Sequence, residues 1–189
     1  MALVRGNVLD IRLKYIEIKA DAEQRNKILD SLSPEFKAEI KKGIKAQEWY
    51  AFEYYIQFNR VIDRVLGKGD LQLIVDLGAF SAELALQGIY RFFYKLGSPE
   101  FLMKNTAYIW KNYFINGEIT LESIEPYKAR VVVENTEIPS HEHCLAIVGW
   151  IKRALEICGG KEVAFKNIVC RETDIHNNNI CEFLFTWQD

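Results

Sequence analysis

The sequence has no excess of charge of either sign. Twenty-four Lys and Arg face 26 Asp and Glu, so the formal net charge is −2. A nucleic-acid backbone or an anionic bilayer is held by a positive field, and we therefore expect no nucleic-acid partner. Only four prolines and a hydrophobic content of 49% argue against a long disordered tail. The chain should fold throughout.

Long apolar runs are also missing. The longest one, residues 71–86, contains two carboxylates and lacks the roughly 20 uncharged residues of a membrane-spanning helix. Three charged residues, Arg5, Asp10 and Arg12, interrupt the apolar segment that an N-terminal signal peptide would need. We expect no membrane span and a cytoplasmic protein. Its four cysteines are then thiols, metal ligands or redox groups before they are disulfides.

Motifs for common catalytic chemistry are absent. Gly67-Lys68-Gly69 has neither the spacing nor the preceding strand of a phosphate-binding loop, so no nucleotide is expected. There is no Gly-x-Ser-x-Gly elbow, and the first histidine is His141. Cys144 follows His143 directly, but neighbours on a helix point about 100° apart and do not form a nucleophile–base pair. The sequence therefore predicts no enzyme.

Helical periodicity covers the first two thirds of the chain. Apolar residues recur there at spacings of three and four, which is typical of amphipathic helices. Ser33-Pro34 and Ser98-Pro99 are helix-start signals. The predicted helices span about residues 8–18, 22–32, 34–43, 49–66, 70–96 and 99–116.

After Gly117 the period changes to about two, which indicates strands. We expect strands around residues 119–121 and 131–133 that form a hairpin, a helix from His141 to about Cys158, and strands over 162–170 and 180–187. Helices segregated from a small antiparallel sheet make an α+β fold. We predict one domain over residues 1–189, with a helical part at about 1–116 and a strand–strand–helix–strand–strand part at about 117–189.

Three cysteines are predicted to converge at one end of this sheet. Cys144 starts a helix, Cys170 ends the next strand, and Cys181 starts the strand after it, with His176 in the loop between the last two. Thiolates with a fourth ligand suit a tetrahedral zinc ion. Free cysteine is also among the most buried residue types, and short Cys-x-x-Cys pairs are missing. Zinc and packed thiols are both open interpretations.

Aromatic residues are dense in the helical part, within residues 49–58, 90–94 and 101–114. Such stripes form a core or a dimer interface, or they line an apolar ligand pocket with a few polar groups. The pocket interpretation selects Trp49, Tyr50, Phe52, Phe92, Phe93 and Trp110.

The last third resembles a known domain. Cys144, Gly149-Trp150, Gly159-Gly160, Cys170 and Cys181-Glu182-Phe183 resemble the closing half of the four-vinyl-reductase domain. In that domain a cysteine-bearing helix precedes a hairpin with two further cysteines.

The N-terminal part, with Arg5-Gly6, Tyr15 and residues 32–35 (Leu-Ser-Pro-Glu), resembles an uncharacterised paralogous family abundant in myxobacteria. Both families look related to the fold shared by TRAPP vesicle-tethering subunits and haem nitric-oxide-binding domains. The resemblance implies an N-terminal helical layer packed on a C-terminal four-stranded antiparallel sheet, homodimerisation, and an interior cavity for an apolar ligand.

The resemblance also bears on cofactors. Cys144, Cys170 and Cys181 match positions where sensor members of the vinyl-reductase group hold zinc, but Asn167 stands at the position of the family's acidic ligand. Haem-binding relatives have a histidine on a helix in the middle of the chain and a Tyr-x-Ser-x-Arg motif, and this sequence has neither. On this basis we expect no haem.

The resulting functional hypothesis is a non-enzymatic, dimeric sensor or adaptor that binds a small hydrophobic molecule and acts through a protein partner. One alternative is a structural protein–protein interaction module without a ligand. Another is an enzyme that reduces a tetrapyrrole vinyl group, although no nicotinamide or flavin motif supplies the reductant.

Overall fold

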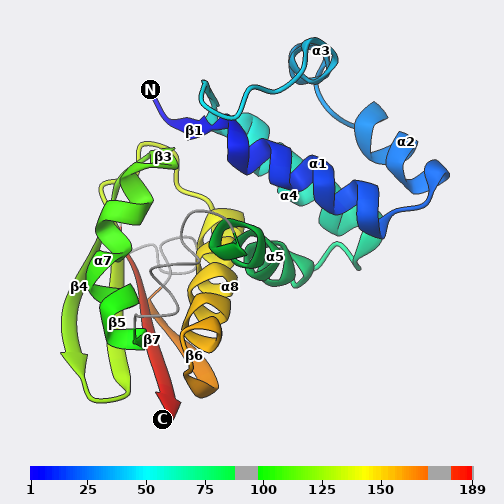
Figure 1. Ribbon diagram of the computed structural model, residues 1–189. Helices are drawn as coiled ribbons and strands as arrows, with labels where there is room; N and C mark the ends of the chain where they lie inside the picture. The colour runs from blue at the N-terminus through cyan, green and yellow to red at the C-terminus, as the bar shows by residue number, and fades with distance from the viewer. Residues whose placement is uncertain (88–97, 170–179, 189) are drawn as a thin grey trace.

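The computed structural model describes residues 1–87, 98–169 and 180–188 (Figure 1). Its helices are α1 (Gly6–Lys19), α2 (Ala22–Asp30), α3 (Pro34–Lys42), α4 (Phe52–Leu66), α5 (Leu73–Gln87), α7 (Pro99–Lys111) and α8 (His141–Ile157). Its strands are β1 (Leu3–Arg5), β2 (Trp49–Ala51), β3 (Phe114–Ile115), β4 (Glu118–Glu125), β5 (Lys128–Glu134), β6 (Lys161–Val169) and β7 (Cys181–Gln188). Among the described residues, no helix is long and apolar enough to cross a membrane.

Side-chain caps fix several helix starts where the sequence predicts them. The hydroxyls of Ser33, Ser98 and Ser140 each accept a hydrogen bond from the backbone N–H three residues on, at the starts of α3, α7 and α8. Asp21 caps α2 and forms a reciprocal capping box with Gln24. Each cap satisfies backbone donors that a helix start otherwise leaves unpaired.

A small three-stranded sheet was not predicted. Residues 49–51 form strand β2 instead of the first turn of a helix, because they pair with the antiparallel strand β1, which also pairs with β3. Strands of two or three residues are too short to show an alternating pattern. The helix predicted from residue 49 therefore begins at Phe52.

The start of α5 is also later than predicted, at Leu73 instead of Asp70. The carboxylate of Asp63 accepts hydrogen bonds from the backbone N–H groups of Leu71 (2.9 Å) and Leu73 (3.2 Å). Leu71 has a positive φ of 67°, so the chain turns there before the helix begins. The predicted end of this helix, near Leu96, lies outside the described residues.

Four longer strands form an antiparallel sheet in the order β4-β5-β7-β6. The predicted hairpin is present as β4 and β5, which turn at Tyr127 with a φ of 61°. Helix α8 packs on β6 and β7, and α7 packs beside β4. Helices grouped against an antiparallel sheet confirm the predicted α+β class (Figure 1).

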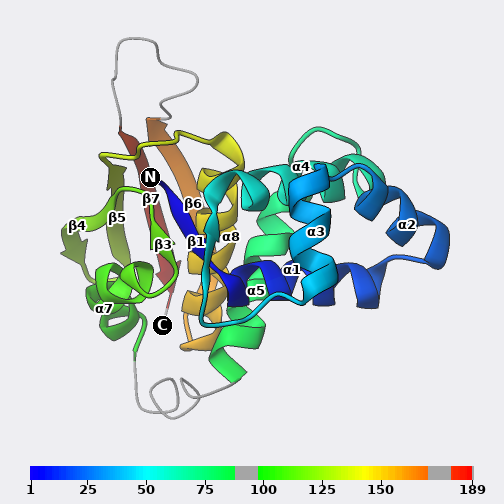
Figure 2. The same ribbon diagram turned by 90° about the horizontal axis from the view of Figure 1, so that it is seen from above.

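Two hydrophobic cores meet where α5 and α8 cross. The N-terminal core joins α1 to α4 with the first half of α5, and the C-terminal core joins the sheet with α7, α8 and the end of α5. In Figure 2, α8 and α5 lie between the four-stranded sheet and helices α1 to α3. The helices cross at Gly78 and Gly149, where an added Cβ would overlap a carbonyl oxygen of the facing helix.

Candidate functional site

A cavity of about 80 Å³ lies where the two cores meet. One side of its wall comes from α1, α4 and α5, and the other from α7, β4, α8 and the residues around β3. The wall consists of Val8, Ile11, Arg12, Tyr55, Gly78, Ser81, Ala85, Thr106, Ile109, Trp110, Tyr113, Phe114, Ile119, Ala146, Ile147, Trp150 and Ile151. Aliphatic and aromatic groups make up most of it. One water needs roughly 10–15 Å³, so the cavity exceeds the space of a single water.

Arg12 on α1 brings a charge into this apolar wall. Its side chain is buried, and Nε donates a hydrogen bond to Oδ1 of Asn59 at 2.6 Å. One terminal nitrogen donates to the carbonyl oxygen of Leu77 (3.3 Å) and to the hydroxyl of Ser81. The guanidinium carbon lies 5.3 Å from the centre of the Tyr55 ring. Burial lowers the pKa of Arg12, but a guanidinium keeps its proton in proteins.

His143, in the first turn of α8, lies against this wall in a box of aromatic rings. The rings, with centroids 4.6 to 5.6 Å from that of the imidazole, are Phe52, Tyr55, Trp110 and Phe114. Within the described part of the chain, neither ring nitrogen has a hydrogen-bond partner. Burial and the nearby charge of Arg12 lower the pKa of His143 to about 3. The imidazole is therefore neutral at physiological pH.

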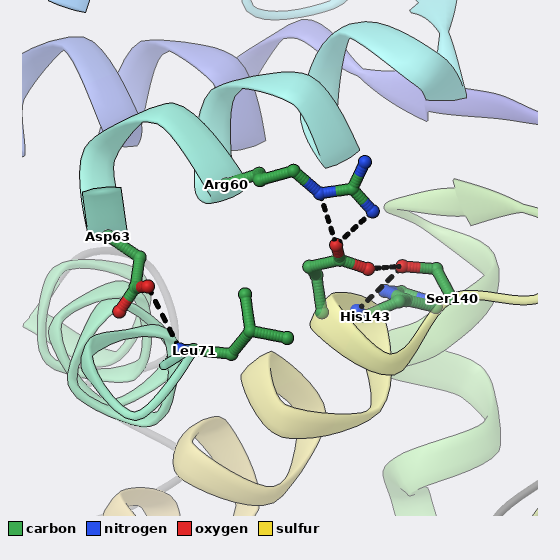
Figure 3. Close-up of polar contacts among 6 residues, drawn as sticks. Arg60, Asp63, Leu71, Ser140 and His143 are labelled. Carbon is green, nitrogen blue, oxygen red and sulfur yellow. Dashed lines mark hydrogen bonds and ion pairs between the residues drawn. The ribbon is translucent and has the colours of Figure 1, made fainter. Parts of the chain in front are cut away.

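Polar contacts next to His143 join the two cores (Figure 3). The hydroxyl of Ser140 accepts from the backbone N–H of His143 (3.2 Å) and donates to Oε2 of Glu142 (2.7 Å). Oε1 of Glu142 accepts from Nε of Arg60 on α4 at 2.7 Å, and a second guanidinium nitrogen also donates to it. The start of α8 is thus tied to α4.

Of the predicted pocket residues, the structure places Trp110 in the cavity wall. Phe52 lies one layer behind, against the rings of Tyr55 and Phe114. Phe92 and Phe93 lie outside the described residues. The cavity wall thus shares Trp110 with the predicted ligand pocket, and the pocket itself stays a prediction.

Trp49 and Tyr50 have other contacts. The guanidinium of Arg5 lies 4.0 Å from the centre of the Trp49 ring. The hydroxyl of Tyr50 accepts a hydrogen bond from the backbone N–H of Lys45 at 2.9 Å. Both residues belong to strand β2, and this strand lies outside the cavity wall.

The structure brings together two of the predicted zinc ligands. The sulfur atoms of Cys144 and Cys181 are 2.9 Å apart, and both side chains are buried in the C-terminal core. Cys170 and His176 lie outside the described residues. Within the described ranges, no group of three or more His, Cys, Asp or Glu side chains could hold a metal. The described residues thus give the zinc prediction no support, and they show Cys144 and Cys181 as a buried thiol pair in the C-terminal core.

Arg12 is the main residue that the sequence analysis missed. It was considered only as a charge that interrupts a signal peptide. Its position carries a usable signal, because Val8, Arg12 and Tyr15 fall on one face of α1 and all three are buried. A charged residue within an apolar helical stripe indicates a buried, paired or functional charge.

Comparisons with known proteins now bear on this arrangement. No protein-family model matches the chain, and no curated protein matches it. Solved structures do match. An H-NOX protein from S. oneidensis in the Fe(II)NO state has a TM-score of 0.75 at 12% identity, covering 98% of this chain and 99% of that one. The Fe(II) unliganded H-NOX protein from K. algicida has a TM-score of 0.69 at 12% identity, covering 98% and 97%.

The chain has the H-NOX fold. The sequence resemblance to haem nitric-oxide-binding domains is thus confirmed at the level of fold. No match supports the four-vinyl-reductase or the myxobacterial family. A third structure, from Shewanella woodyi, is described as IWP-051-bound and has a TM-score of 0.66 at 13% identity, covering 96% of this chain and 93% of that one.

The prediction that haem is excluded is corrected by these matches. The H-NOX structures are described in Fe(II) ligation states, and a further one is described as probing heme distortion in the H-NOX family. The absence of two sequence motifs is therefore not sufficient to exclude the cofactor in this fold.

The cavity residues fit a haem only in part. His143 lies against three rings of the wall. The helix α7, in the middle of the chain, contains no histidine of the kind that haem-binding relatives have. The cavity volume of about 80 Å³ is also smaller than the roughly 300–1,000 Å³ of sites for drug-sized ligands. Haem is therefore one candidate ligand of this cavity, which a binding measurement can test.

Proposed function

We propose that this protein is a non-enzymatic sensor domain that binds a small apolar molecule in the cavity between its two cores. The observation that carries the proposal is the position of this cavity. Its wall combines residues of α1, α4 and α5 with residues of α7, α8 and β4. A ligand there contacts both cores, so binding changes the relative stability of their arrangements.

The H-NOX fold supports the proposal, because several of its solved members are described in NO or CO ligation states or with a bound compound. The contact between Arg60 and Glu142 supplies a connection that a ligand could bias. A single domain over residues 1–189, homodimerisation, a protein partner and a cytoplasmic location remain predictions within this proposal.

An apolar probe and a cavity-filling variant together test whether the cavity binds a ligand. We choose hexan-1-ol as an uncharged apolar probe and measure the melting temperature and the tryptophan fluorescence, to which Trp110 and Trp150 in the wall contribute. A ligand that binds only the folded state raises stability by mass action. We expect hexan-1-ol to raise the melting temperature of the wild type.

Ala85→Leu should abolish this effect by filling the cavity. Ala79→Leu is the matched control, because Ala79 lies on the same helix α5 but outside the wall. An equal response of all three proteins to hexan-1-ol would place binding elsewhere. The structural interaction module predicts no response in any of them.

Haem is tested separately by titrating hemin, with and without dithionite, and recording the Soret band. A stoichiometric band that Ala85→Leu weakens would assign haem as the ligand of this cavity. If every sample shows only the spectrum of free hemin, haem does not bind, and a small apolar molecule stays the proposed ligand.

A further inference from the structure

The guanidinium of Arg12 is a buried positive charge, and the residues that the structure describes place no carboxylate in contact with it. Its hydrogen bonds to described residues go to neutral groups, among them the amide oxygen of Asn59, the carbonyl oxygen of Leu77 and the hydroxyl of Ser81. In the described part of the chain, no Asp or Glu side chain forms an ion pair or hydrogen bond with it. Buried charges in proteins are normally paired or hold a ligand.

Arg12 also belongs to the wall of the cavity. Most of the remaining wall is aliphatic or aromatic, from residues such as Ile109, Trp110 and Ile147. A single cationic group in the wall of a partly enclosed apolar cavity matches a molecule with one anionic end and an apolar body.

We propose that the natural ligand of this cavity is a small apolar carboxylic acid, bound as its carboxylate, and that Arg12 recognises the carboxylate. This inference rests on the proposed function and names the chemical class of its ligand. A planar guanidinium and a carboxylate match in geometry and form charge-assisted hydrogen bonds.

The neutral acceptors around Arg12 hold the guanidinium in place without neutralising it. Asn59 is fully buried, and its Oδ1 accepts from Nε of Arg12, while its Nδ2 has no hydrogen-bond partner among the described residues. Ser81 accepts from Arg12 and donates to the carbonyl oxygen of Leu77 at 2.8 Å. The arginine is therefore preorganised, which lowers the entropic cost of binding.

The volume of the cavity limits the size of the ligand. A dry engineered cavity of about 150 Å³ binds benzene, whereas the present one is about 80 Å³ and only partly enclosed, so the end of a longer acyl chain would extend out of it. Short acyl chains or small branched acids fit this range better than long fatty acids. A series of butanoate, hexanoate and octanoate measures the preferred length.

The decisive experiment uses three probes of one length and different charge: hexanoate, hexan-1-ol and hexylamine at pH 7. Dissociation constants come from tryptophan fluorescence and from shifts in melting temperature. We expect wild-type protein to bind hexanoate at least tenfold more tightly than hexan-1-ol, and hexylamine most weakly.

Asn59→Asp is the sharpest variant, because it has nearly the same shape and gives Arg12 a carboxylate of its own. The variant should bind hexan-1-ol like the wild type and lose the tenfold preference for hexanoate. Arg12→Gln, which removes the charge, should lose the same preference. If Arg12→Gln fails to fold, Asn59→Asp decides alone.

The outcomes separate this inference from the proposed function. Equal binding of hexanoate and hexan-1-ol by the wild type would overturn the role of Arg12 and leave the apolar ligand site intact. Retention of the hexanoate preference in Asn59→Asp would overturn it as well. Failure of all three probes to bind would overturn the proposed function.

Discussion

The carboxylate of Glu142 accepts two hydrogen bonds from the guanidinium of Arg60, with its Oε1 2.7 Å from Nε. Arg60 belongs to the N-terminal helix α4, and Glu142 lies in the first turn of α8, which packs on the sheet. The Glu142 side chain is only 3% exposed, whereas that of Arg60 is 56% exposed. The pair thus links the two cores with one partner buried and the other at the surface.

Arg60→Ala should destabilise the protein, because Glu142 would keep its burial and lose its cation. Breaking a buried pair costs roughly 3–5 kcal/mol, but the exposure of Arg60 reduces the value, and we expect about 1–2 kcal/mol. Urea denaturation measures the change in the free energy of unfolding. Arg64→Ala is the control, because Arg64 is exposed on the same helix. Equal losses in both variants would contradict a specific role for the pair.

The same ion pair should make the free energy of unfolding decrease at acid pH. Burial alone would raise the pKa of Glu142, but hydrogen bonds from Ser140 and the backbone, together with Arg60, hold it below its usual 4.5. Its contribution is therefore complete above pH 4.5 and is lost as the pH falls through the lower folded-state value. In Arg60→Ala this part of the pH dependence should shrink. If the loss of stability at acid pH is the same in Arg60→Ala, other groups cause it.

His143 should produce a separate pH dependence at a higher pH. Its folded-state pKa of about 3 lies below the usual 6.5, so the unfolded chain binds the proton more tightly. Stability from the neutral imidazole is complete above pH 6.5 and falls between pH 6.5 and 3, by roughly 4–5 kcal/mol at most. The measurement is the free energy of unfolding at a series of pH values.

Two variants assign this effect to His143. His143→Phe keeps an aromatic ring in the box and removes two unpaired nitrogens, so it should flatten the slope between pH 6.5 and 4 without a large loss at pH 8. Tyr54→Phe, in the stacked ring pair with Phe36 outside the box, should leave the slope unchanged. A slope that survives His143→Phe would contradict the assignment.

Local signals made much of the fold predictable. Ser33, Ser98 and Ser140 mark helix starts because a short side chain next to the first turn has a direct physical role there. The site was harder to predict from the sequence, because the cavity depends on which faces of α1, α5 and α7 meet. Arg12 shows the difference: α1 periodicity indicates its burial, but its neutral partners are 47 and more positions away.

Asp63 should be essential for the turn between α4 and α5. It is fully buried, and its two oxygens accept from the N–H groups of Leu71, as Figure 3 shows, and of Leu73. Asp63→Ala would leave two donors unpaired where Leu71 already has a positive φ, and we expect a loss of about 2–3 kcal/mol. Asp70→Ala is a milder control, since Asp70 is exposed and, among the described residues, accepts only from Gln72. Losses of equal size would show that the turn does not depend on Asp63.

Gly149→Ala tests the helix crossing between the two cores. Alanine in place of glycine within a helix ordinarily stabilises by about 0.5–1 kcal/mol. Here the new Cβ would overlap the carbonyl oxygen of Val75 on α5, and backbone has little freedom to move away. Gly149→Ala should therefore lower the free energy of unfolding by about 2 kcal/mol or more in urea denaturation. The control is Lys152→Ala, on the exposed side of α8, which should change it by about 0.5 kcal/mol or less. A gain in stability for Gly149→Ala would mean that α5 and α8 are not in close contact at this point.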